Sequence, residues 1–414
     1  MKTIRTGLTL SAILIIFLGA FAFARQPDYP KAPYYQRLGT GEFPIMATYA
    51  FYEPLITPQQ FQWVKEAGFN VISQNLSVAD FEKCLELAKE YGLRVRAITY
   101  DQSKPSKIPG FVAKFKDNPV LFGYRGKDEP NVTQFDSLAR LQATYQKLDP
   151  KSNIFINLLP AVGAKQLGAP DYKTYVEEYV RTVNPPFISY DCYPIKEDKA
   201  GNIYVDNIFY RTIEVVSDIS KKSERPFWAF ILCVQHMNYP KPTKAFLRFQ
   251  MFSNLAYGAQ GILYFTYQLP DYDRGKNTYS NSPIDSDGNR TDVWYMVRDV
   301  NRELINLQNI FLDSEVLDVS LTGQKIPDGS HRLKTLPAPF RILETGEEGV
   351  IVSHLRKDGH EYLMLVNRDV VNKQKVRLSR TREVVRILPT GKEKYEKSAN
   401  VTLDPGGLAL YRVK

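Results

Sequence analysis

The sequence predicts an α/β fold, a (β/α)8 TIM barrel followed by a small all-β sandwich domain. The first observation is an alternation of short β-like runs with amphipathic stretches over residues 43–312, with eight of each, as in a parallel α/β fold. The second is length, because eight such units in about 270 residues match a barrel. The third is that the β-like runs are nearly continuously hydrophobic. A doubly wound sheet is the alternative, but FYEPLITP follows the first run where a Gly-rich phosphate loop would be needed.

Each expected helix is followed within a few residues by a β-branched or aromatic run, as in AGFNVI and YGLRVRAI, where the Gly suits a helix C-cap. The expected strands are Phe43 to Phe51, Asn70 to Asn75, Arg94 to Tyr100, Leu121 to Tyr124, Asn153 to Leu158, Phe187 to Tyr193, Phe227 to Val234 and Gly261 to Tyr267. The expected helices include Pro58 to Ala67, Ala79 to Tyr91, Thr133 to Leu148, Tyr172 to Val183, Asn207 to Ser220, Thr243 to Tyr257 and Asp292 to Phe311.

After the last helix the pattern changes to short alternating strands: GVIVSHL, EYLMLVN, QKVRLS, EVVRIL and LALYRV. Asp-Gly, Pro-Thr-Gly and Pro-Gly-Gly turns separate them. This spacing predicts an all-β module of about 100 residues, most simply a sandwich. The expected domains are therefore a lead-in over residues 25–42, a catalytic-type barrel over 43–312 and a β-sandwich over 313–414.

Residues 1–24 have the pattern of a secretory signal peptide. Lys2 and Arg5 form a charged start, residues 7–21 are mostly apolar, and Ala22-Phe23-Ala24 offers small residues for cleavage. The apolar run is short for a membrane span, and no Cys at the cleavage point could carry a lipid. We therefore expect a periplasmic or secreted protein without a membrane contact after cleavage. An uncleaved anchor is the alternative.

Composition narrows the class of protein further. With 43% hydrophobic and 24% charged residues, the chain is an ordinary globular protein and neither disordered nor collagen-like. The net charge of +9 is spread along the chain, with no basic patch of the kind that nucleic-acid-binding proteins use. Cys84, Cys192 and Cys233 are too few and too irregularly spaced for a zinc site, so buried thiols are expected. No metal and no cofactor is implied.

The polar residues at the expected strand ends are the candidates for function, because a barrel carries its functional groups at the C-terminal ends of its strands. They are rich in Tyr, Asn, Gln and carboxylates and almost lack His and Cys, which favours a neutral polyhydroxylated ligand such as a carbohydrate over a metal or a phosphate. The expected ligand-binding residues are Tyr49, Asn75, Asp128, Asn157, Tyr190, Tyr193, Gln235, Tyr264 and Tyr267.

The segment Asp128-Glu129-Pro130 follows the fourth expected strand and is the strongest single signal. A carboxylate lodged there among Tyr and apolar walls, beside a second acid, would have a raised pKa, as a general acid near neutral pH requires. The alternative is structural: Asp128 and Pro130 would shape a loop and cap the next helix. Two other residues favour structural roles, since Trp228 within strand seven fits the barrel core and Glu53 precedes a proline in a loop.

Residues 43–312 resemble the catalytic barrels of clan A glycoside hydrolases, especially the beta-galactosidase-like members. FGYRGKDEP resembles their strand-four segment, in which an acid/base Glu lies in an Asn-Glu-Pro or Asp-Glu-Pro context. PFISYDCYP resembles the strand-six end of related secreted barrels, and NLAYGAQGILYFTY resembles the passage into strand eight. A following β-sandwich fits the same group. The resemblance implies a glycosidase in which Glu129 is the acid/base.

The resemblance fails at the second carboxylate. Clan A enzymes place a nucleophilic Glu at the end of strand seven, where this sequence has PFWAFILCVQHM, with Gln235 and no acid. Three explanations stay open. Asp191, at the end of strand six, pairs with Glu129; or Asp128 acts with Glu129 while Tyr190 and Asp191 position an N-acetyl group or a water, loosely as in chitinase-like barrels; or the protein binds glycans without cutting them. The expected function is a secreted glycoside hydrolase with catalytic Glu129 and Asp191, and the alternative is a non-catalytic glycan-binding protein.

Overall fold

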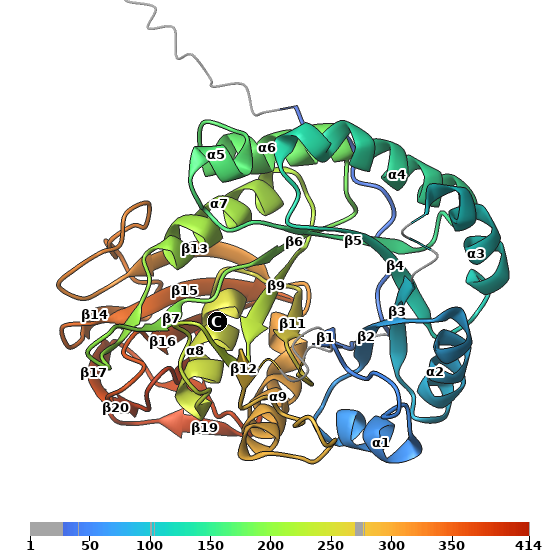
Figure 1. The fold of residues 1–414 in the computed structure, drawn as a ribbon. Helices are drawn as coiled ribbons and strands as arrows, with labels where there is room; N and C mark the ends of the chain where they lie inside the picture. The colour runs from blue at the N-terminus through green and yellow to red at the C-terminus, as the bar shows by residue number, and fades with distance from the viewer. Residues whose placement is uncertain are drawn as a thin grey trace, which may run out of the picture.

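Eight parallel strands form a closed barrel in the computed structural model (Figure 1), which describes residues 28–39, 41–99, 102, 104–269, 276 and 278–413. The order around the barrel is β1-β11-β9-β6-β5-β4-β3-β2, so the chain runs once around it. All eight expected strands are confirmed, whereas the expected signal peptide lies outside the described residues. The strands are β1 Ile45–Thr48, β2 Val71–Leu76, β3 Arg94–Thr99, β4 Leu121–Asp128, β5 Asn153–Leu158, β6 Ile188–Asp191, β9 Phe227–Leu232 and β11 Gly261–Phe265.

Helices surround the barrel, and their starts follow from the sequence. Thr57, Ser77, Asp171, Thr243 and Thr291 each accept a hydrogen bond from a backbone N–H in the first turn of the helix that follows, as N-cap residues do. The helices are α1 Pro58–Glu66, α2 Val78–Glu90, α3 Ile108–Phe115, α4 Phe135–Leu148, α5 Ala164–Leu167, α6 Tyr172–Val183, α7 Ile208–Lys222, α8 Lys244–Ala256 and α9 Asp292–Phe311, with 3-10 turns at Pro105–Lys107 and Val132–Gln134.

The largest difference from the expected strands is in β4, which continues to Asp128 and does not end at Tyr124. The register between β4 and β5 shifts between Arg125 and Asp128, so an irregularity extends the strand. Gly126 makes this close approach possible, because a Cβ there would lie 2.4 Å from Cγ1 of Ile156. Asp128 therefore belongs to the barrel strand and is held by pairing with Asn157.

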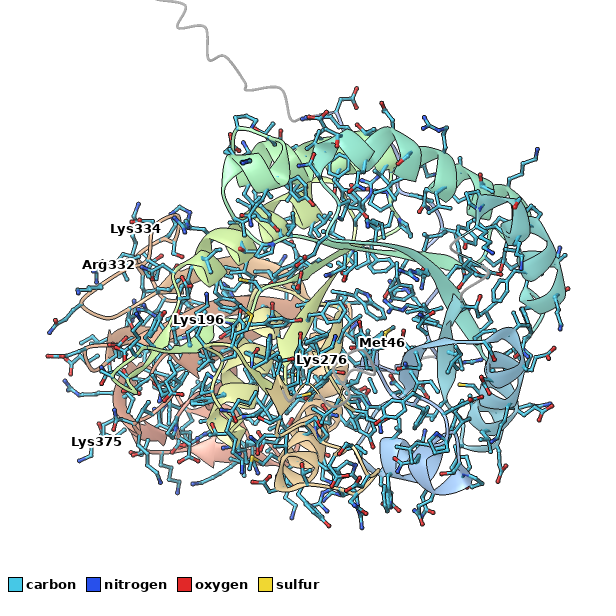
Figure 2. The ribbon with its side chains drawn as sticks, viewed as in Figure 1. Met46, Lys196, Lys276, Arg332, Lys334 and Lys375 are labelled. Atoms are coloured by element: carbon cyan, nitrogen blue, oxygen red, sulfur yellow. The ribbon has the colours of Figure 1, made fainter. Side chains whose placement is uncertain are left out.

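The lower barrel is filled by apolar side chains. Met46, which lies inside the ring of strands in Figure 2, packs in one cluster with Phe122, Phe155 and Trp228. The indole N–H of Trp228 donates to the hydroxyl of Tyr35, from the segment before β1, at 2.9 Å. Trp228 is fully buried, so the prediction that it belongs to the core is confirmed.

The C-terminal region is a β-sandwich of two antiparallel sheets, ordered β13-β15-β16-β21-β18-β19 and β14-β17-β20. All five expected strands are present, and β13, β14, β19 and β20 are added, three of which are five residues or shorter. The strands are β13 Glu315–Leu321, β14 Phe340–Glu344, β15 Val350–Lys357, β16 His360–Asn367, β17 Gln374–Arg380, β18 Val384–Ile387, β19 Glu393–Glu396, β20 Asn400–Leu403 and β21 Leu408–Arg412.

The six-stranded sheet packs against the barrel through one face and against the smaller sheet through the other. Ile351 and Leu355 of β15 belong to the main core cluster, whereas Val350 and Val352 belong to the sandwich cluster, as strand alternation requires. The hydroxyl of Ser353 also donates to the carbonyl of Ala256 at the end of α8 at 2.7 Å. The barrel and the sandwich thus share a packed interface beside α8 (Figure 1).

Three further observations bear on the predicted class of protein. Cys84, Cys192 and Cys233 are buried free thiols, as predicted. Within the described ranges, no cluster of three or more His, Cys, Asp or Glu side chains could hold a metal ion. In the same ranges, no helix is both long and apolar enough to cross a membrane.

Candidate active site

The candidate carboxylates lie at the C-terminal ends of two barrel strands. Asp128 is the last residue of β4 and Glu129 follows it, while Asp191 ends β6. The backbone of Glu129 has φ +45°, a conformation that costs a non-glycine residue free energy and that is common at functional sites. Its N–H donates to the carbonyl of Asn157 at 2.8 Å, which fixes the residue against β5.

Asn157 on β5 links two of the carboxylates. Its side-chain nitrogen donates to Oδ1 of Asp191 at 2.9 Å and to Oδ1 of Asp128 at 3.2 Å. The hydroxyl of Ser189 donates to its amide oxygen at 3.0 Å. Because that oxygen is occupied by a donor, the amide nitrogen must face the carboxylates. Asn157 was expected to bind the ligand, and its position instead makes it the support that spaces Asp128 and Asp191.

The carboxyls of Glu129 and Asp191 are in hydrogen-bond contact. Burial in the barrel mouth raises the pKa of Glu129, and the negative charge of Asp128 raises it further, although the hydrogen bond from Asp191 partly opposes both effects. Burial, followed by the charges of Glu129 and Asp128, raises the pKa of Asp191 well above its usual range. Each of these two acids therefore disfavours ionisation of the other.

Arg96 is a candidate functional residue that the sequence analysis missed. It lies on β3 and its Nε donates to the hydroxyl of Ser73 on β2 at 2.8 Å. Its guanidinium lies 5.3 Å from the ring centroid of Phe155, and the negative charge of Asp128 acts on it. The structure places Arg96 on the opposite face of β3 from the buried Val95 and Ala97.

Aromatic side chains line the mouth beside the carboxylates. The rings of Tyr193 and Phe265 stack with centroids 6.1 Å apart, and Tyr49 meets Phe265 edge-on at 5.6 Å. Burial raises the pKa of both tyrosines, and Asp128 raises that of Tyr49 while Asp191 and Asp128 raise that of Tyr193, which places both hydroxyls near the acids. The ring of His236 extends this row of aromatic side chains. Its centroid lies 4.8 Å from that of the Tyr239 ring and 4.7 Å from that of the Tyr279 ring.

Three tyrosines that were expected to contact the ligand are buried behind the barrel, so those predictions are wrong. The hydroxyl of Tyr190 donates to Asn254 on α8, and that of Tyr264 donates to Asn301 on α9 at 2.7 Å. The hydroxyl of Tyr267 accepts the indole N–H of Trp294 at 3.2 Å. Successive side chains of a strand point to opposite faces. Because Asp191 points into the barrel, its neighbour Tyr190 must point out.

Asn75 and Gln235 are placed differently from each other. Asn75 lies on β2 with a buried side-chain oxygen that has no hydrogen-bond partner in the described part of the chain. Gln235 lies beyond β9 in a two-stranded antiparallel sheet formed by β10 Gln235–His236 and β12 Tyr279–Ser280. The side-chain oxygen of Gln235 accepts from Asn281 at 2.6 Å. Gln235 therefore stabilises the loop that follows β11.

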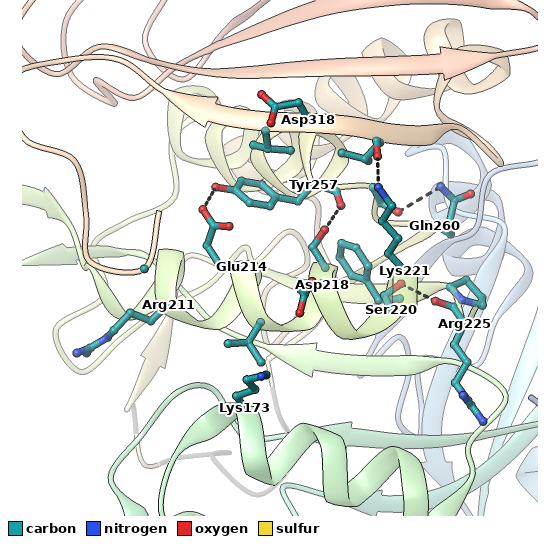
Figure 3. A pocket seen from close by; sticks show the side chains of 18 of the residues that line it. Lys173, Arg211, Glu214, Asp218, Ser220, Lys221, Arg225, Tyr257, Gln260 and Asp318 are labelled. Carbon is teal, nitrogen blue, oxygen red and sulfur yellow. Dashed lines mark hydrogen bonds between the residues drawn. The ribbon is translucent and has the colours of Figure 1, made fainter. Parts of the chain in front are cut away.

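A large groove lies elsewhere, between α7 and β13, with a volume of about 1030 Å³ (Figure 3). Glu214 accepts from the hydroxyl of Tyr257 at 2.8 Å inside it, and Lys221 donates to the carbonyl of Val316 at 3.2 Å. None of the expected site residues lines this groove. The groove is therefore separate from the candidate carboxylates at the barrel mouth.

No protein-family model and no curated protein matches this sequence. Among solved structures, a family 39 glycoside hydrolase from Bacteroides cellulosilyticus aligns with 92% of this chain and 83% of its own, at 12% identity and a TM-score of 0.53. A beta-galactosidase from Marinomonas ef1 aligns with 65% of this chain and 61% of its own, at 9% identity and a TM-score of 0.47. An endoglucanase from Pseudomonas stutzeri aligns with 66% of this chain and 97% of its own, at 14% identity and a TM-score of 0.43. The chain therefore has a (β/α)8 glycosidase fold with a C-terminal β-sandwich.

Proposed function

We propose that this protein is a glycoside hydrolase in which Glu129 is the general acid and base and Asp191 is the nucleophile. The observation that carries the proposal is the contact between the two carboxyls at the barrel mouth, where burial and the neighbouring acids raise the pKa of both. Glycoside hydrolysis needs one protonated and one ionised carboxyl at the same bond. The signal-like residues 1–24 support secretion or a periplasmic location as part of the same proposal.

In the proposed first step, Glu129 protonates the glycosidic oxygen while the ionised Asp191 attacks the anomeric carbon. The leaving group departs and a glycosyl ester forms on Asp191. In the second step, Glu129 removes a proton from water, whose oxygen attacks the anomeric carbon and releases Asp191. Burial and the neighbouring acids raise the pKa of Asp191 well above its usual range. Positive charge that develops on the sugar favours the ionised Asp191 and so leaves the proton with Glu129.

The contact between the carboxyls also favours retention of anomeric configuration. An inverting enzyme separates its two carboxyls by about 6.5 to 9.5 Å to hold a water between acid and base, whereas a retaining enzyme needs only about 5 to 5.5 Å. Hydrogen-bonded carboxyls lie on the short side of this division. Asn157 holds Asp191 in place from below, so separating the pair would break that contact.

Replacing Glu129 tests the proposal. We expect Glu129→Gln to lower kcat/KM on alkyl glycosides by roughly 10² to 10⁴-fold, because general acid catalysis contributes about that much. The loss should be much smaller on aryl glycosides, whose leaving groups need little protonation. The measurement is the initial rate on paired aryl and alkyl glycosides from a panel of plant, algal and host sugars.

Glu53→Gln is the matched control for this experiment. Glu53 is an exposed acid after β1 that interacts with Asp80 and lies outside the carboxylate cluster. We expect this variant to keep wild-type rates on every substrate. A wild-type protein that hydrolyses none of the panel but binds one of its sugars would overturn the proposal.

That last outcome would support the second candidate function, a non-catalytic glycan-binding protein. The observation that favours it is Gln235, which stands near the strand-seven position where the resembling enzymes carry their nucleophilic Glu. The aromatic wall formed by Tyr49, Tyr193 and Phe265 would serve binding equally well.

The pH dependence of the reaction should change when Asp128 is neutralised. The negative charge of Asp128 raises the pKa of both Glu129 and Asp191. In Asp128→Asn this effect is lost, so the pair gives up its proton at a lower pH. We expect the basic limb of the pH profile of kcat/KM to move to lower pH, while the amide oxygen still accepts from Asn157. Asp136→Asn, an exposed residue on α4, should leave the profile in place.

A further inference from the structure

Arg96 presents a guanidinium inside the barrel that only partly binds to protein. Its Nε is fixed by the hydroxyl of Ser73 at 2.8 Å, and its plane is supported by the ring of Phe155 at 5.3 Å. The contact with Ser73 uses the Nε edge of the guanidinium, and the contact with Phe155 uses one of its faces. The two terminal nitrogens make no hydrogen bond and no ion pair with any residue that the structure describes.

A positive charge in this position is costly unless a counter-charge binds it. Arg96 is half-buried, and burial lowers its pKa to about 10 although the negative charge of Asp128 opposes that effect. The side chain therefore remains charged at neutral pH. Asp128 is the nearest acid that acts on it, but it forms no ion pair with Arg96 within 4 Å and is bound by Asn157 instead.

The charge of the mouth permits an anion to enter. Burial and the neighbouring acids raise the pKa of both Glu129 and Asp191, which disfavours two negative charges on this pair. Arg96 and Arg125 supply two positive charges close to them, since Arg125 also acts on Arg96 and Tyr49. Among the residues that the structure describes at the mouth, these arginines place positive charge on the side of β3 and β4.

We propose that the substrate is an anionic glycan, one of whose carboxylate or sulfate groups binds the terminal nitrogens of Arg96. The planar guanidinium donates two parallel hydrogen bonds to such groups, which a neutral hydroxyl cannot accept in the same way. The polar residues at the strand ends predicted a neutral ligand, and Arg96 changes that expectation. This inference rests on the proposed function for the reaction, but its test measures binding and needs no turnover.

The experiment uses full-length Glu129→Gln protein, so that ligands are not consumed, and isothermal titration calorimetry. The ligands are methyl glycosides, whose hydrolysis depends on the acid Glu129, in pairs that differ by one anionic group: β-glucuronide with β-glucoside, β-galacturonide with β-galactoside, and 6-sulfated with unsulfated β-galactoside. We expect the anionic member of at least one pair to bind at least ~10-fold more tightly, as the loss of a bidentate contact predicts, and we expect sodium chloride to reduce the difference. The carboxylate and sulfate pairs show which anion the site accepts.

Arg96→Gln in the same background should abolish the preference. Arg94→Gln is the matched control, because it removes the same charge at the start of the same strand, where Arg94 donates to the carbonyl of Pro119. If Arg96→Gln does not fold by circular dichroism, Arg96→Lys replaces it and should reduce the preference at least ~3-fold, since lysine lacks the planar fork.

Three results would overturn the inference: no preference for the anionic member of any pair, no binding of any anionic ligand, or a preference that survives replacement of Arg96. Failure of the proposed function would be recognised by a different experimental result. It would appear as hydrolysis that Glu129→Gln leaves unchanged, whatever the ligand preference is.

Discussion

Asp191→Ala should lower kcat/KM by roughly 10⁴-fold on every substrate that the wild type hydrolyses, including aryl glycosides. The proposed nucleophile forms the bond to the anomeric carbon, so a good leaving group cannot replace it, in contrast to the acid Glu129. The substitution also removes the acceptor that Asn157 contacts at 2.9 Å. The measurement is the single-turnover and steady-state rate on the best aryl glycoside of the panel.

Azide tests the chemical role of Asp191 directly. In Asp191→Ala the lost carboxylate leaves space beside the anomeric carbon, and azide should restore turnover by attacking that carbon to give a glycosyl azide of inverted configuration. In Glu129→Ala azide should give the retained configuration, because it attacks the intermediate on Asp191 from the other face. Retained azide product from Asp191→Ala, or full activity without azide, would show that Asp191 is not the nucleophile.

The barrel could be predicted from sequence because its signals are local and repeated. Each βα unit shows a hydrophobic run and an amphipathic helix, and several of the helices begin at a polar N-cap such as Ser77 or Thr243. Eight such units leave few architectures. The complete set of strands in the sandwich was harder to predict from the sequence. β14 and β20 are short, alternate with exposed polar residues and pair with β17, which is distant from both in sequence. Their strand structure depends on these pairings and is not visible in the local pattern.

The site could be predicted only as far as strand ends could be located. Glu129, Asp191, Asp128 and Asn157 were found because barrel function concentrates at those ends. The direction of each side chain was not available, because the irregularity between Arg125 and Asp128 shifts the alternation in β4. Near the end of β11 the exposure pattern likewise places Phe265 in the mouth, whereas Tyr264 and Tyr267 pack outside.

Arg96 shows a second reason why part of the candidate site could not be predicted from the sequence. It lies three residues from the end of β3, where an arginine in a strand is usually assigned to a surface. Its long side chain reaches charged residues at the end of β4 from a lower position in the barrel. Sequence position alone thus places Arg96 below the site, whereas the length of its side chain brings its charge into it.

The apolar cluster inside the barrel lies below this site. Substitutions of Trp228 and Gly261 test how much the packing of this cluster contributes to stability. The Trp228 ring packs against Phe122, Phe155 and Phe187 with centroids 5.4 to 6.0 Å apart. A Cβ at Gly261 would lie 2.2 Å from Cδ2 of that ring. We expect Trp228→Ala to lower the free energy of unfolding by about 3 to 5 kcal/mol through the cavity it leaves. Gly261→Val should lower it by about 1 to 3 kcal/mol through overpacking.

In the double variant the valine occupies space that the indole has vacated. The combined loss of unfolding free energy should therefore be smaller than the sum of the single losses by about 1 to 2 kcal/mol, measured by urea denaturation of all four proteins. A single transition is expected, because the barrel and the sandwich share one core cluster. Trp63→Ala is the control, since Trp63 lies on α1 beside Arg290 and should combine additively with Gly261→Val. Additive losses for Trp228 and Gly261 would mean that the lower barrel does not depend on the contact between this ring and β11.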